Sequence, residues 1–463
     1  MPEQLIPGHG SETLITPTAV VIVVTSILLA WFLPRKYVVW PLILSAVVIP
    51  GSQVVVVGGL HFMMYRIIIL FVWFRVAASV VAEWGSARVF KLNSLDKLIL
   101  TWALSAVVTF TILWGSLDAF INRMGLVYNA FGLYFLFRYL IRDWDDVDRT
   151  VKVFAAACVI LAVCMSIEQS TGRNLFSLFG GVPEYDLVRE GRIRAQAGFA
   201  HPILAGTFAA VSAPLFFGLL WKGKGSRIVA GTGLIASLIM TVASASSTPV
   251  GAYMGGVAAL FCWPLRKRMR MVRWGIVLML IAMQMYMHNP IWHAIGRLNL
   301  VGGSASWHRE MLVDAFMRHI GEWWLVGTQN NYEWGYDTWD ASNQYVNTGV
   351  TGGLPTLVLF IAIIVQGFRM VGRARRQYED GRTNEKGYWA LGSSLMGNAV
   401  GFFGVSYFDQ TIIVWYALLA MVSAVAALNP GAHSATTQVD ALSFTPSELE
   451  MEVPSSGLGS RSH

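Results

Sequence analysis

Arg189, Arg192 and Arg194 fall within six positions of one polar segment, and the pair His201-Pro202 follows them at the start of a charge-free apolar run. Arginine presents a planar fork of N–H donors that matches the oxygens of a phosphate group, and it stays charged at any physiological pH. Arginines beside a membrane surface could therefore hold a diphosphate head group. Alternatively, they extend apolar stems along the membrane and contact ordinary lipid head groups.

A second polar segment, residues 296–346, contains His308, Arg309 and Asp340. Arg309 is a further candidate for binding an anion. A carboxylate such as Asp340 can orient or deprotonate a hydroxyl group, and His308 is either a second base or an ordinary side chain at the membrane boundary. Spacing alone leaves the choice of base open.

The same segment ends in the stretch WDASNQYVNTGVTGGL, residues 339–354, where polar side chains lie at the mouth of an apolar run. Asn343 and Tyr345 offer amide and hydroxyl groups that can bind a polar ligand. We expect them to line the floor of a cleft that opens outward.

Six tryptophans lie in or beside this polar segment. Indole rings favour the membrane–water boundary, which is the simpler explanation for them. Their faces can also stack on the sugar rings of a ligand that is part lipid and part glycan. We take Trp324 as a candidate for that role; the others are Trp292, Trp307, Trp323, Trp334 and Trp339.

Metal and nucleotide chemistry have no motif in this chain. The histidines of the polar segment match no zinc spacing, and there is no HExxH motif or Cys/His cluster. P-loop, GxGxxG and GxSxG motifs are missing as well. We therefore expect no metal, no cofactor, no soluble nucleotide substrate and no nucleic-acid partner.

The composition indicates that membrane helices position these residues. Of the 463 residues, 55% are hydrophobic and 13% are charged, whereas a soluble domain carries about a quarter charged residues. We predict an all-α polytopic integral membrane protein with about 12–13 transmembrane helices, since about 20 apolar residues are needed to cross a bilayer. The predicted spans are 15–33, 37–59, 65–83, 98–117, 125–141, 153–168, 203–221, 228–245, 248–264, 274–287, 345–368, 388–408 and 411–428.

Basic residues orient these spans. Four short basic segments, which begin at residues 34, 221, 266 and 369, fall at alternate ends of the spans, as cytoplasmic connections do. The loops 169–202 and 288–344 mix acids with arginines and are placed on the outer face. Residues 1–428 then form one transmembrane domain, and the Ser-rich tail 429–463 is predicted to be disordered and cytoplasmic.

Some charges lie inside the apolar runs or at their ends. Arg75 is in the middle of a span and faces either a functional polar cavity or a structural partner. Asp118 and Asp409 could pair with arginines on the outer face. Within the loop 288–344, apolar residues recur at helical spacing from Trp307 to His319, which predicts an amphipathic helix on the outer leaflet, capped by Ser304 or Ser306.

Three local patterns resemble those of the O-antigen ligase and polymerase superfamily of bacterial membrane glycosyltransferases. Residues 194–208, RAQAGFAHPILAGTF, are similar to that family's Arg, Gly-Phe, Asn-Pro stretch, with His201 in the place of Asn. Residues 304–332 are similar to its Ser, Arg, helix and Pro-Leu-x-Gly-x-Gly stretch, and residues 340–360 to its Asp-x-His-Asn-x-Tyr-Leu pattern. The likeness covers about residues 60–428.

The resemblance implies a metal-independent glycosyltransferase of the bacterial inner membrane, with a large periplasmic loop that contains amphipathic helices. Its substrate would be a glycan carried on undecaprenyl diphosphate. Membrane lipids and other polysaccharide assembly proteins are the expected partners. In this scheme Arg192, Arg194 and Arg309 hold the diphosphate, and Asp340 or His308 activates the attacking hydroxyl. The remaining substrate contacts would come from His201, Asn343, Tyr345 and Trp324.

One departure from the family pattern changes the expected reaction. Ser342 stands where ligases of this family place a histidine, and a serine cannot take a proton near neutral pH without a base of its own. A polymerase that extends O-antigen or exopolysaccharide is therefore the leading hypothesis, and a ligase that joins glycan to lipid A–core is the alternative. A lipid-linked glycan flippase is a second alternative, although few charges lie within the spans and no internal repeat is visible.

Overall fold

The computed structural model describes residues 13–57, 60–82, 92–185, 187–189, 191–287, 290–293, 305–377 and 383–428. The chain divides into one unit, Met1–Ala426, and a second, Ala427–His463. The predicted disorder of the tail falls outside the described residues, and so do the side chains of the predicted caps Ser304 and Ser306.

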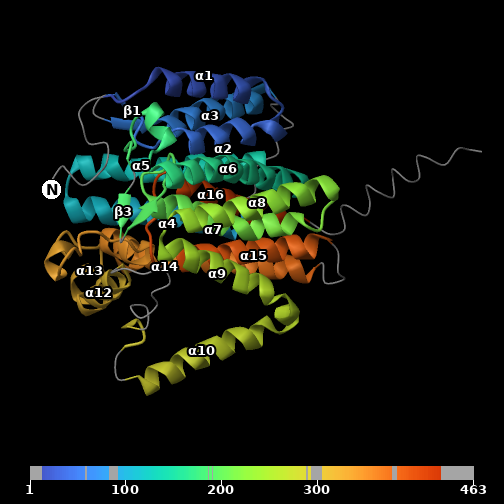
Figure 1. Ribbon diagram of the computed structural model, residues 1–463. Coiled ribbons are helices and arrows are strands. Elements are labelled where there is room, and N and C mark those ends of the chain that lie inside the picture. The colour runs from blue at the N-terminus through green and yellow to red at the C-terminus, as the bar shows by residue number, and fades with distance from the viewer. Residues whose placement is uncertain are drawn as a thin grey trace, which may run out of the picture. The chain divides into compact units, whose positions relative to one another are not determined.

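Helices dominate the first unit (Figure 1). They are α1 (Pro17–Phe32), α2 (Val39–Val48), α3 (Met64–Ala82), α4 (Ser94–Trp114), α5 (Leu117–Leu140), α6 (Trp144–Thr171), α7 (Pro202–Leu219), α8 (Lys224–Ala243), α9 (Ser247–Phe261), α10 (Met269–Tyr286), α12 (Ala305–Arg318), α13 (Ile320–Trp323), α14 (Gln344–Arg376), α15 (Thr383–Gly401) and α16 (Thr411–Ala426).

Short elements complete the unit. Two antiparallel strand pairs occur among the described residues, β1 (Val54–Val57) with β2 (Leu60–Met63) and β3 (Leu187–Arg189) with β4 (Arg192–Arg194). The 3-10 helices are η2 (Arg35–Tyr37), η3 (Leu175–Phe179), η4 (Trp263–Arg268) and η5 (Asn331–Trp334).

The helices agree with a multi-pass membrane protein. Within the described part of the chain, six helices are long and apolar enough to cross a membrane, namely α3, α4, α6, α7, α8 and α14. Helices α1 and α16 are apolar but shorter. The predicted span 37–59 is wrong as a single helix: α2 ends at Val48, before the turn at Pro50 and Gly51, and β1 follows. A proline restricts the residue before it to extended conformations, which ends the helix there.

Helices α7 and α16 form the centre of the unit. Every residue of α16 from Thr411 to Val425 is buried, and α7 is buried over most of its length. A helix that is apolar on all sides is stable when other helices surround it. Helices α8, α9 and α15 pack against α7, and α5 and α14 pack against α16.

Arg75 has a structural partner rather than a polar cavity. Its guanidinium donates to the carbonyl of Ala30 and, at 2.6 Å, to that of Leu33. Both carbonyls lie at the C-terminal end of α1, where helix carbonyls lack partners within the helix. A cation there also interacts favourably with the helix dipole.

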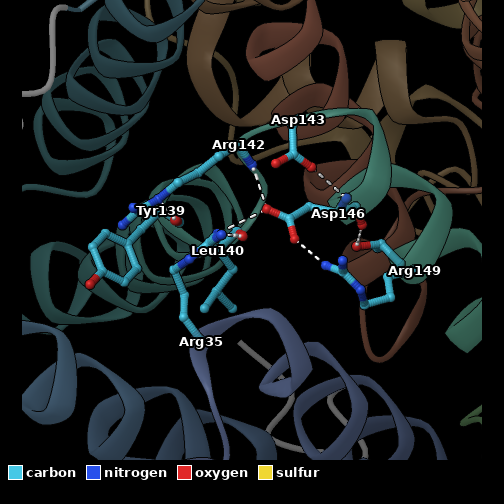
Figure 2. A network of polar contacts seen from close by, with 8 residues as sticks. Arg35, Tyr139, Leu140, Arg142, Asp143, Asp146 and Arg149 are labelled. Atoms are coloured by element: carbon cyan, nitrogen blue, oxygen red, sulfur yellow. Dashed lines mark hydrogen bonds and ion pairs between the residues drawn. The ribbon is translucent and has the colours of Figure 1, made fainter. Parts of the chain in front are cut away.

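Carboxylates hold several arginines at the predicted cytoplasmic ends of the helices. Figure 2 shows buried Asp146, which pairs with Arg35 at 2.9 Å and with Arg149. Buried Glu385 likewise pairs with Arg266 at 3.1 Å and with Arg375 at 3.0 Å. Four arginines at this end therefore have charge partners within the protein.

Helix α10 has no buried residue. Figure 1 shows it apart from the other helices, whereas α12 and α13 lie against the start of α14.

Candidate functional site

Two groups of hydrogen bonds fix the segment that carries Arg194. The buried carboxylate of Glu168, near the end of α6, accepts from the backbone N–H groups of Gln196 (2.7 Å) and Ala197 (2.8 Å). Asn174 donates to the Ala197 carbonyl at 2.9 Å, and the Ala195 N–H donates to Ala243 of α8 at 3.1 Å. The turn that follows β4 is therefore held between α6 and α8.

Arg194 and Arg309 converge on the start of α9. The Arg194 guanidinium donates to the hydroxyl of Ser246 at 2.6 Å, and its side chain is only 6% exposed. Arg309 donates to Ser247 at 3.3 Å and to Thr248 at 2.6 Å. Three consecutive hydroxyl residues thus bring together Arg194 of β4 and Arg309 of α12.

The two arginines have no charge partner within the described residues. Neither guanidinium forms an ion pair with a carboxylate there, and the Nε atom of Arg194 is buried without a hydrogen bond. Burial lowers the pKa of Arg309 to about 10, and repulsion from Arg189 and Arg194 adds to the effect. Burial and Arg189 likewise lower the pKa of Arg194. A bound anion would relieve this repulsion, because opposite charges within a few ångströms favour each other's ionised forms.

A cleft of about 350 Å³ adjoins these arginines. Arg192 lies on its wall. Ser246 also lines the cleft, and its hydroxyl accepts the hydrogen bond from Arg194. The apolar part of the wall comes from β4, α8 and α9 through Ile193, Val242 and Val250.

His201 begins α7 as an uncharged cap. Its Nδ1 accepts from the backbone N–H of Ile203 at 3.2 Å, which assigns the ring hydrogen to Nε2. Burial, with the positive charges of Arg194 and Arg189, lowers the pKa of His201 to about 4. His201 therefore does not contribute positive charge to the site at neutral pH.

Helix α12 is anchored on the protein rather than on the outer leaflet, which corrects the predicted position of its apolar face. Leu312 and Phe316 are buried against Val346 and Val350 of α14. The ring of Phe316 stacks on Trp323 with 3.9 Å between ring centroids. Helix formation was predicted, but the face is covered by α14.

A second face of α12 carries two carboxylates that bind the chain after α10, a set of contacts that the sequence did not predict. Glu310 and Asp314 are one helical turn apart, so they share a face. His293 contacts Glu310 through Nδ1 and Asp314 through Nε2 at 3.5 Å, and the indole N–H of Trp292 donates to Asp314 at 3.1 Å. The chain that follows α10 thus holds the helix that carries Arg309.

His308 and Asp340, both candidates for catalysis, interact electrostatically. Burial raises the pKa of Asp340, and His308 opposes this shift. The Nε2 atom of His308 is buried without a hydrogen bond. His308 directly precedes Arg309 on α12, so one of the two candidate bases lies on the helix that carries one arginine of the pair.

Asn343 and Tyr345 use their polar atoms within the protein. The Asn343 amide oxygen caps α14 by accepting from the N–H groups of Tyr345 (2.9 Å) and Val346 (3.2 Å), and its nitrogen donates to Phe403 at 3.2 Å. The Tyr345 hydroxyl donates to Ala399 of α15 at 2.9 Å. Both side chains therefore join the start of α14 to α15 or to the turn after it, and their position on the floor of a cleft stays a prediction.

Three of the six tryptophans expose half of their surface: Trp307, Trp324 and Trp339. The others have partners within the protein. Trp323 is buried, Trp292 donates to Asp314, and Trp334 stacks on His319 with 5.1 Å between ring centroids. Trp324 therefore remains a candidate for stacking on a sugar.

Helix α14 is broken where the loop meets it. Gly353 has a φ of +70°, and Leu354 donates to the Trp324 carbonyl at 2.8 Å instead of continuing the helix. The Val350 carbonyl accepts from the N–H of Thr328, also at 2.8 Å. The sequence Gly352-Gly353-Leu354-Pro355 carried the signal for this break, because glycine and proline interrupt helices.

No family model matches the chain, and no curated protein matches it.

Proposed function

We propose that this protein transfers glycan carried on undecaprenyl diphosphate at the periplasmic face of the bacterial inner membrane, as a polysaccharide polymerase. The supporting observation is the pair Arg194 and Arg309, which meet on neutral hydroxyl groups without a carboxylate partner among the described residues. Other arginines of the chain, such as Arg35 and Arg375, do have such partners.

The donor would bind with its diphosphate against the arginine pair. Guanidinium groups fixed in advance stabilise the negative charge that develops on the lipid diphosphate when the bond to the sugar breaks. Arg192 would extend this site along the wall of the adjoining cleft, whose apolar residues suit the first part of the lipid chain.

The acceptor hydroxyl would lie near Asp340 and His308. A carboxyl group with a raised pKa is a better proton acceptor when it is ionised, because Brønsted behaviour links basicity to proton transfer. Holding both membrane-bound substrates in register would contribute much of the rate. Trp324 is available for stacking on a sugar ring of either substrate.

Arg309→Ala tests the proposal in cells that lack the chromosomal copy of the protein. We expect the surface glycan to collapse to single repeat units without the protein, to return to long chains with the wild type, and to remain short with Arg309→Ala. The matched control is Arg270→Ala, because Arg270 lies exposed on α10. Gel profiles of surface and lipid-linked glycan provide the measurement.

Each gel pattern has a defined meaning. Long polymer that accumulates on the lipid carrier and never reaches lipid A–core would indicate a ligase in place of a polymerase. Glycan that is unchanged in cells without the protein would rule out both reactions. Equal effects of Arg309→Ala and Arg270→Ala would remove the arginine pair from the proposal.

A further inference from the structure

Asp409 is a buried carboxyl group without a cation beside it in the described part of the chain. It lies in the connection between α15 and α16 and is only 4% exposed. The sequence suggested an ion pair between Asp409 and an arginine of the outer face, and the structure corrects this: its Oδ2 accepts from the backbone N–H of Ala200 at 2.8 Å. Its Oδ1 is buried without a hydrogen bond.

The corner formed by Asp409 and Gln410 joins two distant turns. Gln410 donates to the carbonyls of Gly198 at 2.8 Å and Ile49 at 3.1 Å. Oδ1 of Asp409 lies so close to Gly51 that a Cβ atom there would overlap it. Asp409 itself has a φ of +58°, in the left-handed region that non-glycine residues rarely adopt. A conformation of this kind persists when its surroundings impose it.

These contacts hold the segment that carries the candidate site. Gly198 and Ala200 lie between Arg194 and the helix cap His201. Glu168 and Asn174 fix the first half of this segment, as described above, and the corner fixes the second half. A change at Asp409 is therefore transmitted to Arg194 through six residues of chain.

An ionised carboxylate is costly in this position. Charges buried without a partner shift toward the neutral form. Burial raises the pKa of Asp409 to about 7, although the backbone N–H groups of Ala200 and Gln410 act in the opposite direction. The titratable side chains around this corner include Tyr65 of α3, which interacts electrostatically with Asp409, Tyr407, which lies two residues before it, and His201, which follows Ala200. None of these three side chains is a cation at neutral pH.

We propose that Asp409 is a positioning residue: in its neutral form it holds the segment from Arg194 to His201 against the Gly51 turn, and its ionisation releases that segment. The released carboxyl group would reach water and a new set of partners. The position of this segment can be measured without substrate, so its test is independent of the proposed transferase reaction.

The direction of the pH effect follows from linkage. The carboxyl group has an ordinary pKa near 3.8 when it is released and about 7 when it is held. Between these pH values the released state binds fewer protons than the held state. The equilibrium constant for release therefore increases about tenfold for each unit by which the pH rises. Above about pH 7 both states are ionised, and the equilibrium constant for release no longer changes with pH.

Hydrogen–deuterium exchange of the full-length protein in lipid nanodiscs tests this expectation. We expect the protection of peptides covering residues 194–201, after correction for the intrinsic exchange rate, to fall by about tenfold per unit from pH 5 to pH 7 and then to level off. Asp409→Asn, which keeps the shape and removes the charge, should abolish this dependence. Asp118→Asn is the control, because Asp118 is exposed in the first turn of α5.

Protection that does not change with pH in the wild type would overturn the proposal, as would the same pH dependence in Asp409→Asn. Gly51→Ala provides an independent variant in case Asp409→Asn does not fold. Its methyl group would displace the Asp409 carboxyl group, so residues 194–201 should lose protection already at pH 5. Unchanged protection of Gly51→Ala at pH 5 would also contradict the proposal.

Discussion

His201 illustrates how neighbouring charge limits what a side chain can do. It lies between a helix that needs a cap and two arginines that disfavour a further cation. Its established contact is therefore that of a neutral hydrogen-bond acceptor. Asparagine is a preferred residue for the same contact at the start of a helix.

His201→Asn should preserve stability within a few tenths of a kcal/mol, whereas His201→Ala should cost about 1 kcal/mol because the N–H of Ile203 loses its partner. Thermal unfolding in detergent measures both changes. Because the pKa of His201 is about 4, its charge does not change between pH 5.5 and pH 8. His201→Asn should therefore leave the pH profile of the proposed glycan transfer unaltered. A profile that shifts in the Asn variant would contradict the neutral role.

At the residue scale, spacing predicted which side chains could bind an anion but not which would meet. Arg189, Arg192 and Arg194 are close in sequence, so their proximity was predictable. The meeting of Arg194 with Arg309 depends on Ser246, Ser247 and Thr248, which carry no motif. Tertiary contacts between separate loops leave no periodic signal in the sequence.

The roles of Asn343 and Tyr345 could be inferred only in part. Asparagine before a helix is a typical N-cap, and that local signal was present. The bond from the Tyr345 hydroxyl to Ala399 depends on how α14 meets α15, so it required the structure.

At the scale of the elements, α12 was predicted as an amphipathic helix from its apolar spacing, and the helix is present. The same apolar face is compatible with lipid or with another helix, since both are apolar environments. Its burial against α14 decides between them. For residues 37–59 the predicted single helix is wrong, since this apolar run contains the end of α2, a turn and β1.

Gly353→Ala should destabilise the junction between α13 and α14. A Cβ atom at Gly353 would overlap the Leu325 carbonyl. The backbone angles of Gly353, a φ of +70° with a ψ of −179°, lie in a region that is essentially confined to glycine, and they cost another residue about 1–3 kcal/mol. We expect a lower midpoint of thermal unfolding and a reduced rate of the proposed glycan transfer.

Gly372→Ala is the matched control on the same helix. A Cβ atom there would meet no neighbouring atom, and alanine favours a helix by about 0.5–1 kcal/mol over glycine. Similar unfolding midpoints for the two variants would show that the break at Gly353 is not required.

At the scale of the whole molecule, basic residues predict which ends of the helices face the cytoplasm. Asp146 and Glu385 with their arginines lie at the predicted cytoplasmic ends, and the arginine pair at the opposite ends. This polarity rests on charge bias, which can be read from the sequence without knowledge of packing, and it stays a prediction. The sequence could not reveal that α10 lacks buried residues, which depends on the neighbours of that helix.

Labelling with a membrane-impermeant maleimide tests this orientation. Tyr185→Cys lies in the loop before Arg189 and should react in cells whose outer membrane alone is opened. Lys224→Cys lies at the start of α8 and should react only after the inner membrane is opened; both positions are exposed. The unsubstituted chain, which contains Cys158, Cys164 and Cys262, gives the background. The reverse pattern would invert the topology.

The break in α14 also bears on how this chain can change during evolution. The Leu354 N–H and the Val350 carbonyl, which would bond to each other in a regular helix, are each completed by the backbone of residues 324–328. Deleting or lengthening that stretch would leave both groups without partners in an apolar environment, where each costs several kcal/mol. Insertions should therefore be tolerated at the exposed Gly335–Tyr336 turn far better than between Trp324 and Thr328. The loop and the helix must vary as one unit.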